Sequence, residues 1–171
     1  MLNSKDELLV VREKTGPSAR VKDFWKLPGG LCDRQEDIPK AAVRELREET
    51  AIESEFVSIA SIQEVHHSSE RAGPSRAGTT DLYIICVLKV KDEAQRIVPC
   101  EKEIAEAKWM PAKELLSLPF YAAQGSVFSH MFSHAYKVAR GEAPGLQVER
   151  LKLGYLPAEN NLFGAFGSAK M

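Results

Sequence analysis

Three glutamates lie close together in one short stretch, RELREET, at residues 44–50. Glu48 and Glu49 follow Glu45 by three and four positions, which places both on the same face as Glu45 if the stretch is helical. Each like-charged pair at that spacing destabilises an isolated helix by roughly 0.2–0.5 kcal/mol. A divalent cation would offset the repulsion, because Mg²⁺ and Mn²⁺ prefer oxygen ligands. A solvated helix face is the alternative that this stretch alone leaves open.

A helix must position these glutamates, and the sequence predicts one over residues 38–49. Asp37 has a side chain of the kind that caps a helix N-terminus, and Pro39 falls in the first turn, where a missing N–H is tolerated. Ile38, Ala42 and Leu46 recur at a spacing of four and make the predicted buried stripe, with Ala41 and Val43 beside it. The three glutamates are therefore expected to lie largely off the buried stripe.

The other elements follow from apolar runs, alternation and turn residues. Strands are expected at residues 7–13, 24–30, 55–67, 82–90 and 103–111, with a weak strand at 146–153. Helices are expected at residues 112–118 and 124–141, and loops at residues 14–23, 31–37 and 68–80. The inward side chains of the helix over 124–141 are predicted to be Val127, Phe128, Met131, Phe132, Ala135 and Val138, with Gly141 as C-cap. This mixture favours an α+β or α/β sandwich.

The residues around the glutamates fit a longer pattern. Residues 30–52, GLCDRQEDIPKAAVRELREETAI, match G-x5-E-x7-R-E-U-x-E-E-x-G-U, where U is apolar. The matched positions are Gly30, Glu36, Arg44, Glu45, Leu46, Glu48, Glu49 and Ile52. At a background usage of about 7% for each fixed residue type, chance agreement is on the order of 10⁻⁷ per start position. The pattern is the Nudix box, and the chain resembles the Nudix hydrolase family.

The resemblance implies an α/β fold, a Nudix-type α/β/α sandwich with a mixed sheet, and a cofactor, Mg²⁺ or Mn²⁺. It assigns metal ligation to Glu45, Glu48, Glu49 and the backbone carbonyl of Gly30, and catalysis to Glu45, Glu48 and Arg44. Arg44 would hold Glu45 through a charge-assisted hydrogen bond. Glu36 would support the loop or a further metal, and Gly29 would let the loop backbone approach closely. A purely structural salt link is the alternative for Glu36 and Arg44.

Two features depart from the family pattern. Ala51 stands where the family has glycine, and it should cost about 1 kcal/mol if a left-handed backbone is kept there. Family members also usually begin with a Gly- and Ala-rich strand before the segment that matches residues 2–11. The resemblance therefore predicts a missing first strand and an exposed sheet edge.

Segments outside the box point to one branch of the family. FWKLPGG (24–30), DLYIICVLKV (81–90) and EIAEAKWMPAKEL (103–115) are similar to a eukaryotic subfamily that includes plant ADP-ribose/NADH pyrophosphatases and the animal Nudix protein encoded antisense to a fibroblast growth factor. This implies hydrolysis of nucleoside diphosphate-X substrates, chiefly ADP-ribose and NADH, with release of AMP. The alternatives are coenzyme A or nucleoside triphosphates as substrates, or a catalytically weak module that binds ADP-ribose, NADH or a protein partner.

Several further side chains could touch the substrate, and each has a plainer interpretation. Glu101 and Glu103 could supply a general base or support the substrate, or could be surface charge. Trp25 could stack on a base or pack in the core. The remaining candidates are His66, His67, Arg71 and Arg76, for which a solvated strand end or loop charge is favoured, and His130 and His134, for which a surface pair is favoured over a zinc site.

Length and composition limit the remaining possibilities. A chain of 171 residues favours one domain, or at most two. We expect a Nudix hydrolase domain at 1–141 and a C-terminal extension at 142–171. A net charge of −1 gives no reason to expect binding to nucleic acid or membrane. The resemblance implies a small-molecule nucleotide as partner, and a homodimer is left open. Three widely spaced cysteines and no signal-peptide pattern favour the cytoplasm, or an organelle if the true N-terminus lies upstream.

Overall fold

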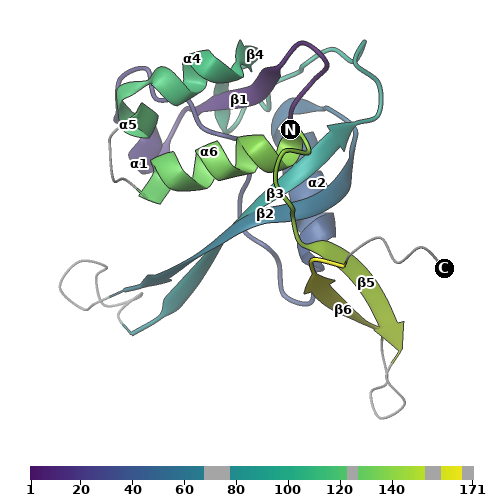
Figure 1. Ribbon diagram of the computed structural model, residues 1–171. Helices are drawn as coiled ribbons and strands as arrows, with labels where there is room; N and C mark the ends of the chain where they lie inside the picture. The colour runs from purple at the N-terminus through teal and green to yellow at the C-terminus, as the bar shows by residue number, and fades with distance from the viewer. Residues whose placement is uncertain (68–77, 123–126, 153–158, 167–171) are drawn as a thin grey trace.

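The elements below are those of a computed structural model, labelled as in Figure 1, which describes residues 1–67, 78–122, 127–152 and 159–166. The strands are β1 (Glu7–Glu13), β2 (Ser54–His66), β3 (Thr80–Val90), β4 (Ile104–Pro111), β5 (Gln147–Lys152) and β6 (Glu159–Gly164). The helices are α1 (Gly16–Ala19), α2 (Ile38–Thr50), α4 (Ala112–Ser117), α5 (Pro119–Ala122) and α6 (Val127–Ala139). The predicted loop at 68–80 lies mostly outside the described residues.

The strands pair in three antiparallel ladders: β1 with β4, β2 with β3, and β5 with β6. The β2–β3 pair is the longest, and its far end extends away from the body of the molecule (Figure 1). Helices and strands are mixed along the chain, so the predicted α/β class is confirmed. Within the described residues, the expected mixed sheet takes the form of these separate antiparallel pairs.

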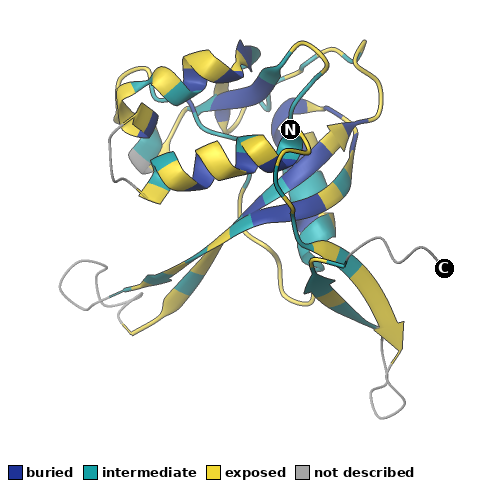
Figure 2. Cartoon of the chain, viewed as in Figure 1, coloured by how far each residue is buried: buried dark blue, intermediate teal, exposed yellow. Residues whose placement is uncertain are grey.

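Two apolar clusters cover opposite faces of the β2–β3 pair. On one face, Ile85 and Val87 of β3 belong to the same cluster as Phe132 of α6. On the other face, Leu88 of β3 joins Leu46 of α2. Successive residues of a strand point to opposite faces, so one strand serves both clusters. The pair thus lies between α6 and α2, and Figure 2 shows the buried residues gathered there rather than at the far end of the ribbon.

The free edge of β1, expected to be exposed, is partly covered by nearby residues. Leu2 forms an isolated antiparallel bridge with Leu8, and the amide of Leu9 donates to the Met1 carbonyl at 3.3 Å. Further along the same edge, Val11 and Lys26 exchange two backbone hydrogen bonds of 2.9 and 3.0 Å. These contacts satisfy backbone groups that a bare edge would leave unpaired.

Several local predictions were wrong. Residues 24–30 form no strand and make only the single bridge at Lys26, because Pro28 and two glycines end any regular extension. The short helix α1 lies within the expected loop at 14–23. Val127, predicted to face inward, is 50% exposed because it is the first residue of α6. The strand β6 was not predicted at all.

Other local predictions are confirmed. The helix α2 begins at Ile38 as expected and extends one residue past the predicted end. The chain leaves α6 through Gly141 in a left-handed conformation, with φ of 73°. Among the helices of the described residues, none has the length and apolar character needed to cross a membrane.

Candidate active site

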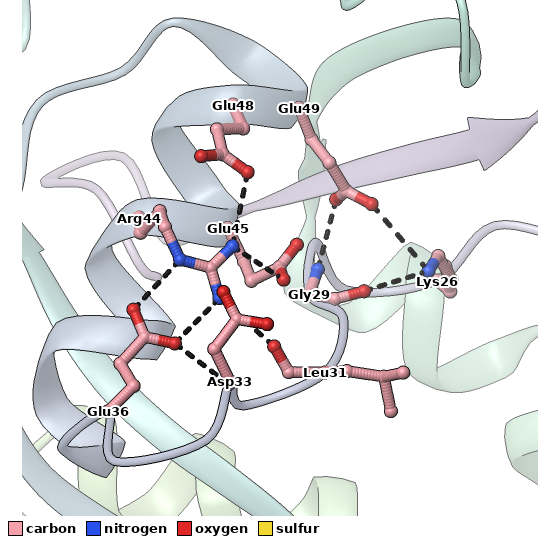
Figure 3. A network of polar contacts seen from close by, with 9 residues as sticks. All are labelled: Lys26, Gly29, Leu31, Asp33, Glu36, Arg44, Glu45, Glu48 and Glu49. Atoms are coloured by element: carbon pink, nitrogen blue, oxygen red, sulfur yellow. Dashed lines mark hydrogen bonds and ion pairs between the residues drawn. The ribbon is translucent and has the colours of Figure 1, made fainter.

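One arginine gathers three of the box glutamates. The Nε and Nη2 atoms of Arg44 donate to both carboxylate oxygens of Glu36, each at 2.8 Å. Its Nη1 atom donates to Glu45 at 2.8 Å and to Glu48 at 3.1 Å, and Nη2 also reaches the Leu31 carbonyl at 3.0 Å. Figure 3 shows this guanidinium at the centre of the cluster. A planar fork that bonds to carboxylates on two sides fixes their relative orientation.

The box loop is joined to the helix mainly through Glu36. Its carboxylate receives the two bonds from Arg44 and a third, of 3.0 Å, from the Asp33 amide. Hydrogen bonding from Arg44, and then from Asp33, lowers the pKa of Glu36 to about 2. Hydrogen bonding to Glu36 and Glu45 likewise raises the pKa of Arg44. The expected contact between Arg44 and Glu45 is present, and the Glu36–Arg44 ion pair is the strongest link in the cluster by number of bonds.

Glu49 lies apart from that cluster. It is 5% exposed, so the expectation that all three glutamates lie off the buried stripe was wrong for this residue. Its carboxylate accepts a 3.0 Å hydrogen bond from the Gly29 amide and lies 3.8 Å from the Lys26 ammonium. Burial raises the pKa of Glu49 to about 7, although Lys26 and Gly29 act in the opposite direction. Lys26 also donates to the Gly29 carbonyl at 3.2 Å and pairs with Glu13 at 2.5 Å.

Gly30 is held directly against Glu45. A β-carbon built on Gly30 would lie 2.5 Å from one carboxylate oxygen of Glu45 and 2.8 Å from the other. Only glycine leaves room for that approach. The adjacent Gly29 has φ of 151° and supplies its amide to Glu49, so both glycines of the loop contact box glutamates. The predicted close approach of the loop backbone is present.

The donor set fits a hard divalent cation by its chemistry, because three carboxylates and a backbone carbonyl offer oxygen only. The space left by the missing side chain of Gly30 brings that backbone against the Glu45 carboxylate. The arrangement is charge-compensated by protein cations: Arg44 binds Glu45 and Glu48, and Lys26 approaches Glu49. Across residues 1–67, 78–122, 127–152 and 159–166, no three His, Cys, Asp or Glu side chains converge as a metal cluster.

Glu101 and Glu103 lie in the turn before β4, where they were expected, and both are exposed. The turn is fixed by Lys14, whose amide donates to the Glu103 carbonyl at 2.8 Å and whose side chain bonds to the Glu101 carbonyl. It is connected to α2 because the Cys100 amide donates to the Glu49 carbonyl at 3.0 Å. The structure thus places this turn beside the end of the glutamate helix, without a described contact from either carboxylate to the box.

Most of the remaining candidates take their plainer interpretations or go undescribed. Trp25 is buried in the core, with the Lys108 ammonium 4.5 Å from its ring centroid. His66 is exposed at the end of β2, as expected for a solvated strand end. His67 is half-buried and bonds to Asp81 at 2.7 Å, so the same interpretation was wrong for this residue. His130 and His134 are exposed on α6. Arg71 and Arg76 lie outside the described residues.

Sequence reasoning missed Lys26 as a member of the site. It neutralises Glu13, faces Glu49 and holds the Gly29 carbonyl, and so connects β1 to the box loop. A signal was present, since Lys26 is the one cation between Trp25 and the glycines of the box. It was overlooked because residues 24–30 were interpreted as a strand. The alternation of apolar residues in a strand does not indicate whether a charged side chain reaches a neighbouring helix.

Fold and site together define a class. The β2–β3 pair lies between the helices α2 and α6. The glutamates of α2 lie against the glycine loop, and Arg44 bonds to several of them. This is the arrangement of a Nudix domain. The chain belongs to the Nudix family: the model described as NUDIX domain matches residues 1–131.

Known proteins similar to the chain come from plants and animals. It is 35% identical to Nudix hydrolase 5 of Arabidopsis thaliana over 74% of the chain and 39% of the relative. It is 38% identical to Nucleoside diphosphate-linked moiety X motif 6 of Homo sapiens over 66% of the chain and 32% of the relative. The chain therefore spans about a third to two fifths of the length of these curated relatives.

Solved structures support the fold. A UDP-X diphosphatase superposes with a TM-score of 0.56 at 15% identity, covering 83% of the chain and 60% of that protein. The MutT protein from Methanosarcina mazei Go1 superposes with a TM-score of 0.54 at 20% identity, covering 80% of the chain and 88% of that protein. At these identities the likeness concerns the fold alone.

Proposed function

We propose that the protein is a divalent-metal-dependent hydrolase that cleaves the diphosphate of nucleoside diphosphate-X compounds. ADP-ribose and NADH are the proposed substrates, and AMP is the nucleotide product. The observation that supports this most strongly is the Arg44 fork, which holds Glu36, Glu45 and Glu48 together at 2.8–3.1 Å. A solvated helix face would need no such organisation, because exposed ion pairs contribute little.

The proposed roles follow from the positions of the side chains. Glu45, Glu48, Glu49 and the carbonyl of Gly30 would hold Mg²⁺ or Mn²⁺. The bound cation would neutralise phosphate oxygens and strengthen water as a nucleophile. Arg44 would keep the Glu45 and Glu48 carboxylates in a fixed orientation, and Gly30 would keep the loop backbone against Glu45.

The chemical step is the addition of water across the P–O–P bridge. The water oxygen forms a bond to one phosphorus, the bond from that phosphorus to the bridging oxygen breaks, and the departing phosphate keeps the bridging oxygen. A carboxylate must take the proton that water loses. Glu49 is the proposed support for that step within the box, with its carboxylate held by the Gly29 amide at 3.0 Å. Glu101 and Glu103, in the turn joined to Glu49 through Cys100, are the proposed sources of a base outside the box.

The choice of substrate rests on the relatives. The human relative is named for nucleoside diphosphate-linked moieties, and it shares 38% identity with this chain across 112 residues. The sequence segments that resemble the ADP-ribose/NADH branch include β3 and β4. We further infer that residues 1–141 form the hydrolase domain and that the protein acts in the cytoplasm.

The test is product analysis with metal control. The purified chain is incubated with ADP-ribose, NADH, coenzyme A and dGTP, with Mg²⁺, Mn²⁺ or a chelator, and nucleotide products are separated by chromatography. The Glu48→Gln variant runs beside it, with Arg47→Gln as a matched control on the exposed side of the same helix. We expect AMP from ADP-ribose and NADH, only with metal, and not from the Glu48 variant.

Other outcomes would change the proposal in defined ways. Turnover of only coenzyme A or dGTP would support the proposed hydrolysis but would contradict ADP-ribose and NADH as the substrates. Tight binding of ADP-ribose or NADH by a folded protein that releases no product would replace the enzyme with a binding module. Turnover that persists in chelator and in the Glu48→Gln variant would contradict the assignment of the site.

A further inference from the structure

The C-terminal strand pair, β5 with β6, lies beyond the residues that match the family, yet it is fastened to the body of the domain. At its base, Leu146 and Ile59 exchange two backbone hydrogen bonds of 2.8 Å, which connect the pair to β2. Gly145 is closely packed there, because a β-carbon on it would lie 2.5 Å from the Ser58 hydroxyl and 2.8 Å from Val138 of α6. This first anchor fixes where the pair leaves the domain.

A second anchor lies at the start of the glutamate helix. The Asn161 amide of β6 donates to one carboxylate oxygen of Asp37 at 3.0 Å, and Arg150 of β5 donates to the other at 3.3 Å. Lys40 also pairs with Asp37 at 2.8 Å. Figure 1 shows β6 beside the lower end of α2, in agreement with these contacts.

Asp37 is the N-cap residue of α2 as expected, and these bonds explain why its side chain does not make the capping hydrogen bond. Asp37 has an extended backbone and its carbonyl accepts the amides of Lys40 and Ala41, but its side chain makes no capping bond. The carboxylate is turned instead towards Arg150 and Asn161, more than a hundred residues away along the chain. Hydrogen bonding from Lys40 lowers the pKa of Asp37, with smaller contributions from Arg150 and Asn161, so the carboxylate is charged at neutral pH.

Asp37 is the neighbour of Glu36, and Glu36 carries the Arg44 fork. Apart from the bonds between Arg44 and Glu36, the loop at 31–37 is held by few bonds. Arg44 donates to the Leu31 carbonyl at 3.0 Å, the Asp33 amide donates to the Glu36 carboxylate, the Glu36 amide donates to the Asp33 carbonyl, and the Cys32 thiol bonds to the Glu36 carbonyl at 3.3 Å. Its residues are exposed or half-buried, so no apolar packing fixes the loop. A tether on Asp37 therefore restricts the position of Glu36 and, through it, the orientation of Arg44.

We propose that the C-terminal strand pair is part of the active-site architecture, with Arg150 and Asn161 as positioning residues that hold Asp37 and thereby align the Glu36–Arg44 pair. The effect on turnover rests on the proposed function. The effect on Arg44 itself does not, because it concerns bonds present in the protein alone. The extension is thus a part of the site that the family pattern does not contain.

The experiment compares the Arg150→Ala/Asn161→Ala double variant with Lys152→Ala. Lys152 is an exposed cation two residues along β5, hence on the same face as Arg150, and no bond from it to α2 is found among the described residues. Five quantities are measured on the full chain: hydrogen exchange of the Arg44 Nε–H by NMR, the Mn²⁺ dissociation constant by electron paramagnetic resonance, kcat and KM for ADP-ribose, and the melting temperature.

We expect Arg44 Nε–H exchange in the double variant to be on the order of tenfold faster than in Lys152→Ala. We expect the double variant to bind Mn²⁺ about tenfold more weakly and to have a kcat about tenfold lower, as when a residue that orients a metal ligand is removed. KM should stay within about twofold. Arg150→Lys, with Asn161 intact, should restore values near those of the unmodified chain. A merely structural role would lower the melting temperature and leave Mn²⁺ affinity and kcat of the folded protein unchanged.

The outcomes separate this proposal from the proposed function. If the double variant matches Lys152→Ala in Arg44 exchange, positioning by the strand pair is overturned whatever the activity. If the unmodified chain neither binds Mn²⁺ nor turns over substrate, the proposed function fails, and the exchange measurement still decides whether the strand pair holds Arg44. If exchange rises but Mn²⁺ affinity and kcat do not change, the strand pair is a structural support and the proposal is overturned for the active site.

Discussion

The α-carbon of Gly30 lies under the carboxylate of Glu45 so closely that a β-carbon there would be 2.5 Å from Oε2 and 2.7 Å from Cδ. Real side chains do not pack at such distances, so any residue other than glycine must displace Glu45 or the loop. The same carboxylate is bonded to Arg44 at 2.8 Å from the other side. Glu45 is therefore fixed between a glycine and an arginine, and small changes on either side should move it.

Gly30→Ala is expected to displace the Glu45 carboxylate by roughly an ångström and to lower kcat by about a hundredfold. The methyl group enters space that Glu45 now fills, and a shift of this size in a reacting group costs about two orders of magnitude. Steady-state kinetics with ADP-ribose and Mg²⁺ measure the loss.

Gly78→Ala is the matched control for Gly30→Ala. It stands in a left-handed conformation with φ of 74°, and a β-carbon there would meet no atom within 4 Å. It should lower stability by about 1 kcal/mol and leave kcat unchanged. Equal kcat in both variants would show that contact with Glu45 does not matter for turnover.

Ala51→Gly is expected to stabilise the protein by roughly 0.5–1 kcal/mol. Ala51 follows α2 with φ of 59° and donates its amide to the Arg47 carbonyl at 2.7 Å, so the left-handed cap of the family is kept here by an alanine. Glycine removes the steric cost of that conformation. This gain is larger than the loss of stability caused by the greater conformational entropy that glycine gives the unfolded chain. Urea unfolding followed by circular dichroism gives the free energy of unfolding.

Ala42→Gly provides the comparison for Ala51→Gly. Ala42 lies inside α2, at a position with ordinary helical backbone. Glycine there should lower the free energy of unfolding by about 1 kcal/mol. Loss of stability in both variants would mean that residue 51 is not strained.

The sequence predicted well what depends on local order. The extent of α2, the strands β1 and β3, and the contact of Arg44 with Glu45 follow from periodicity and from the spacing of the box. The left-handed backbone at Ala51 was expected from the glycine of the family pattern, and it is present. Each of these features is decided by residues within about one helical turn or by a motif that fixes their spacing.

The sequence predicted poorly what distant residues decide. Asp37 has the right type for an N-cap, but Arg150 and Asn161 compete for its carboxylate. Glu49 counts as polar in any helical pattern, yet the Gly29 amide allows its carboxylate to be buried. In each case a tertiary hydrogen bond outweighed a local preference worth about 1 kcal/mol.

In metal-free solution, Glu49 should make the folded state less stable as pH rises from 4.5 towards 7. Its pKa is raised from 4.5 to about 7 by burial, so the folded state binds the extra proton within that window. The contribution is present below pH 4.5 and lost above about pH 7. Relative to Glu49→Gln, the unmodified protein should lose on the order of 2–3 kcal/mol across the window, measured by urea unfolding with chelator.

Glu36→Gln is the control for the pH dependence, because the pKa of Glu36 is lowered to about 2 by Arg44. Its contribution is present above pH 4.5 and lost only as pH falls towards 2, so its difference from the unmodified protein should be flat between pH 4.5 and 7. Added Mg²⁺ should reduce the slope due to Glu49, since a cation favours the ionised carboxylate. If the difference in free energy of unfolding between Glu49→Gln and the unmodified protein does not change between pH 4.5 and about 7, Glu49 is not a buried, uncharged carboxyl in the folded protein.

Arg44→Lys tests whether the fork, rather than its charge, organises the site. Arg44 makes five hydrogen bonds with four residues, and an ammonium at the same place has three donors and no fixed plane. Lysine should keep the pairing with one or two carboxylates and release the others. We expect kcat to fall by roughly 10- to 100-fold and Mn²⁺ affinity by about tenfold, measured by kinetics and electron paramagnetic resonance.

Arg47→Lys makes the same chemical change three residues along α2, where the arginine is exposed and only approaches Glu53 at 4.0 Å. It should alter neither kcat nor Mn²⁺ affinity, because an exposed pair at that distance contributes little. If Arg44→Lys behaves like Arg47→Lys, a single positive charge suffices and the geometry of the guanidinium is irrelevant. If only Arg44→Lys loses metal affinity, the alignment of Glu45 and Glu48 by the planar fork accounts for the need for arginine at this position.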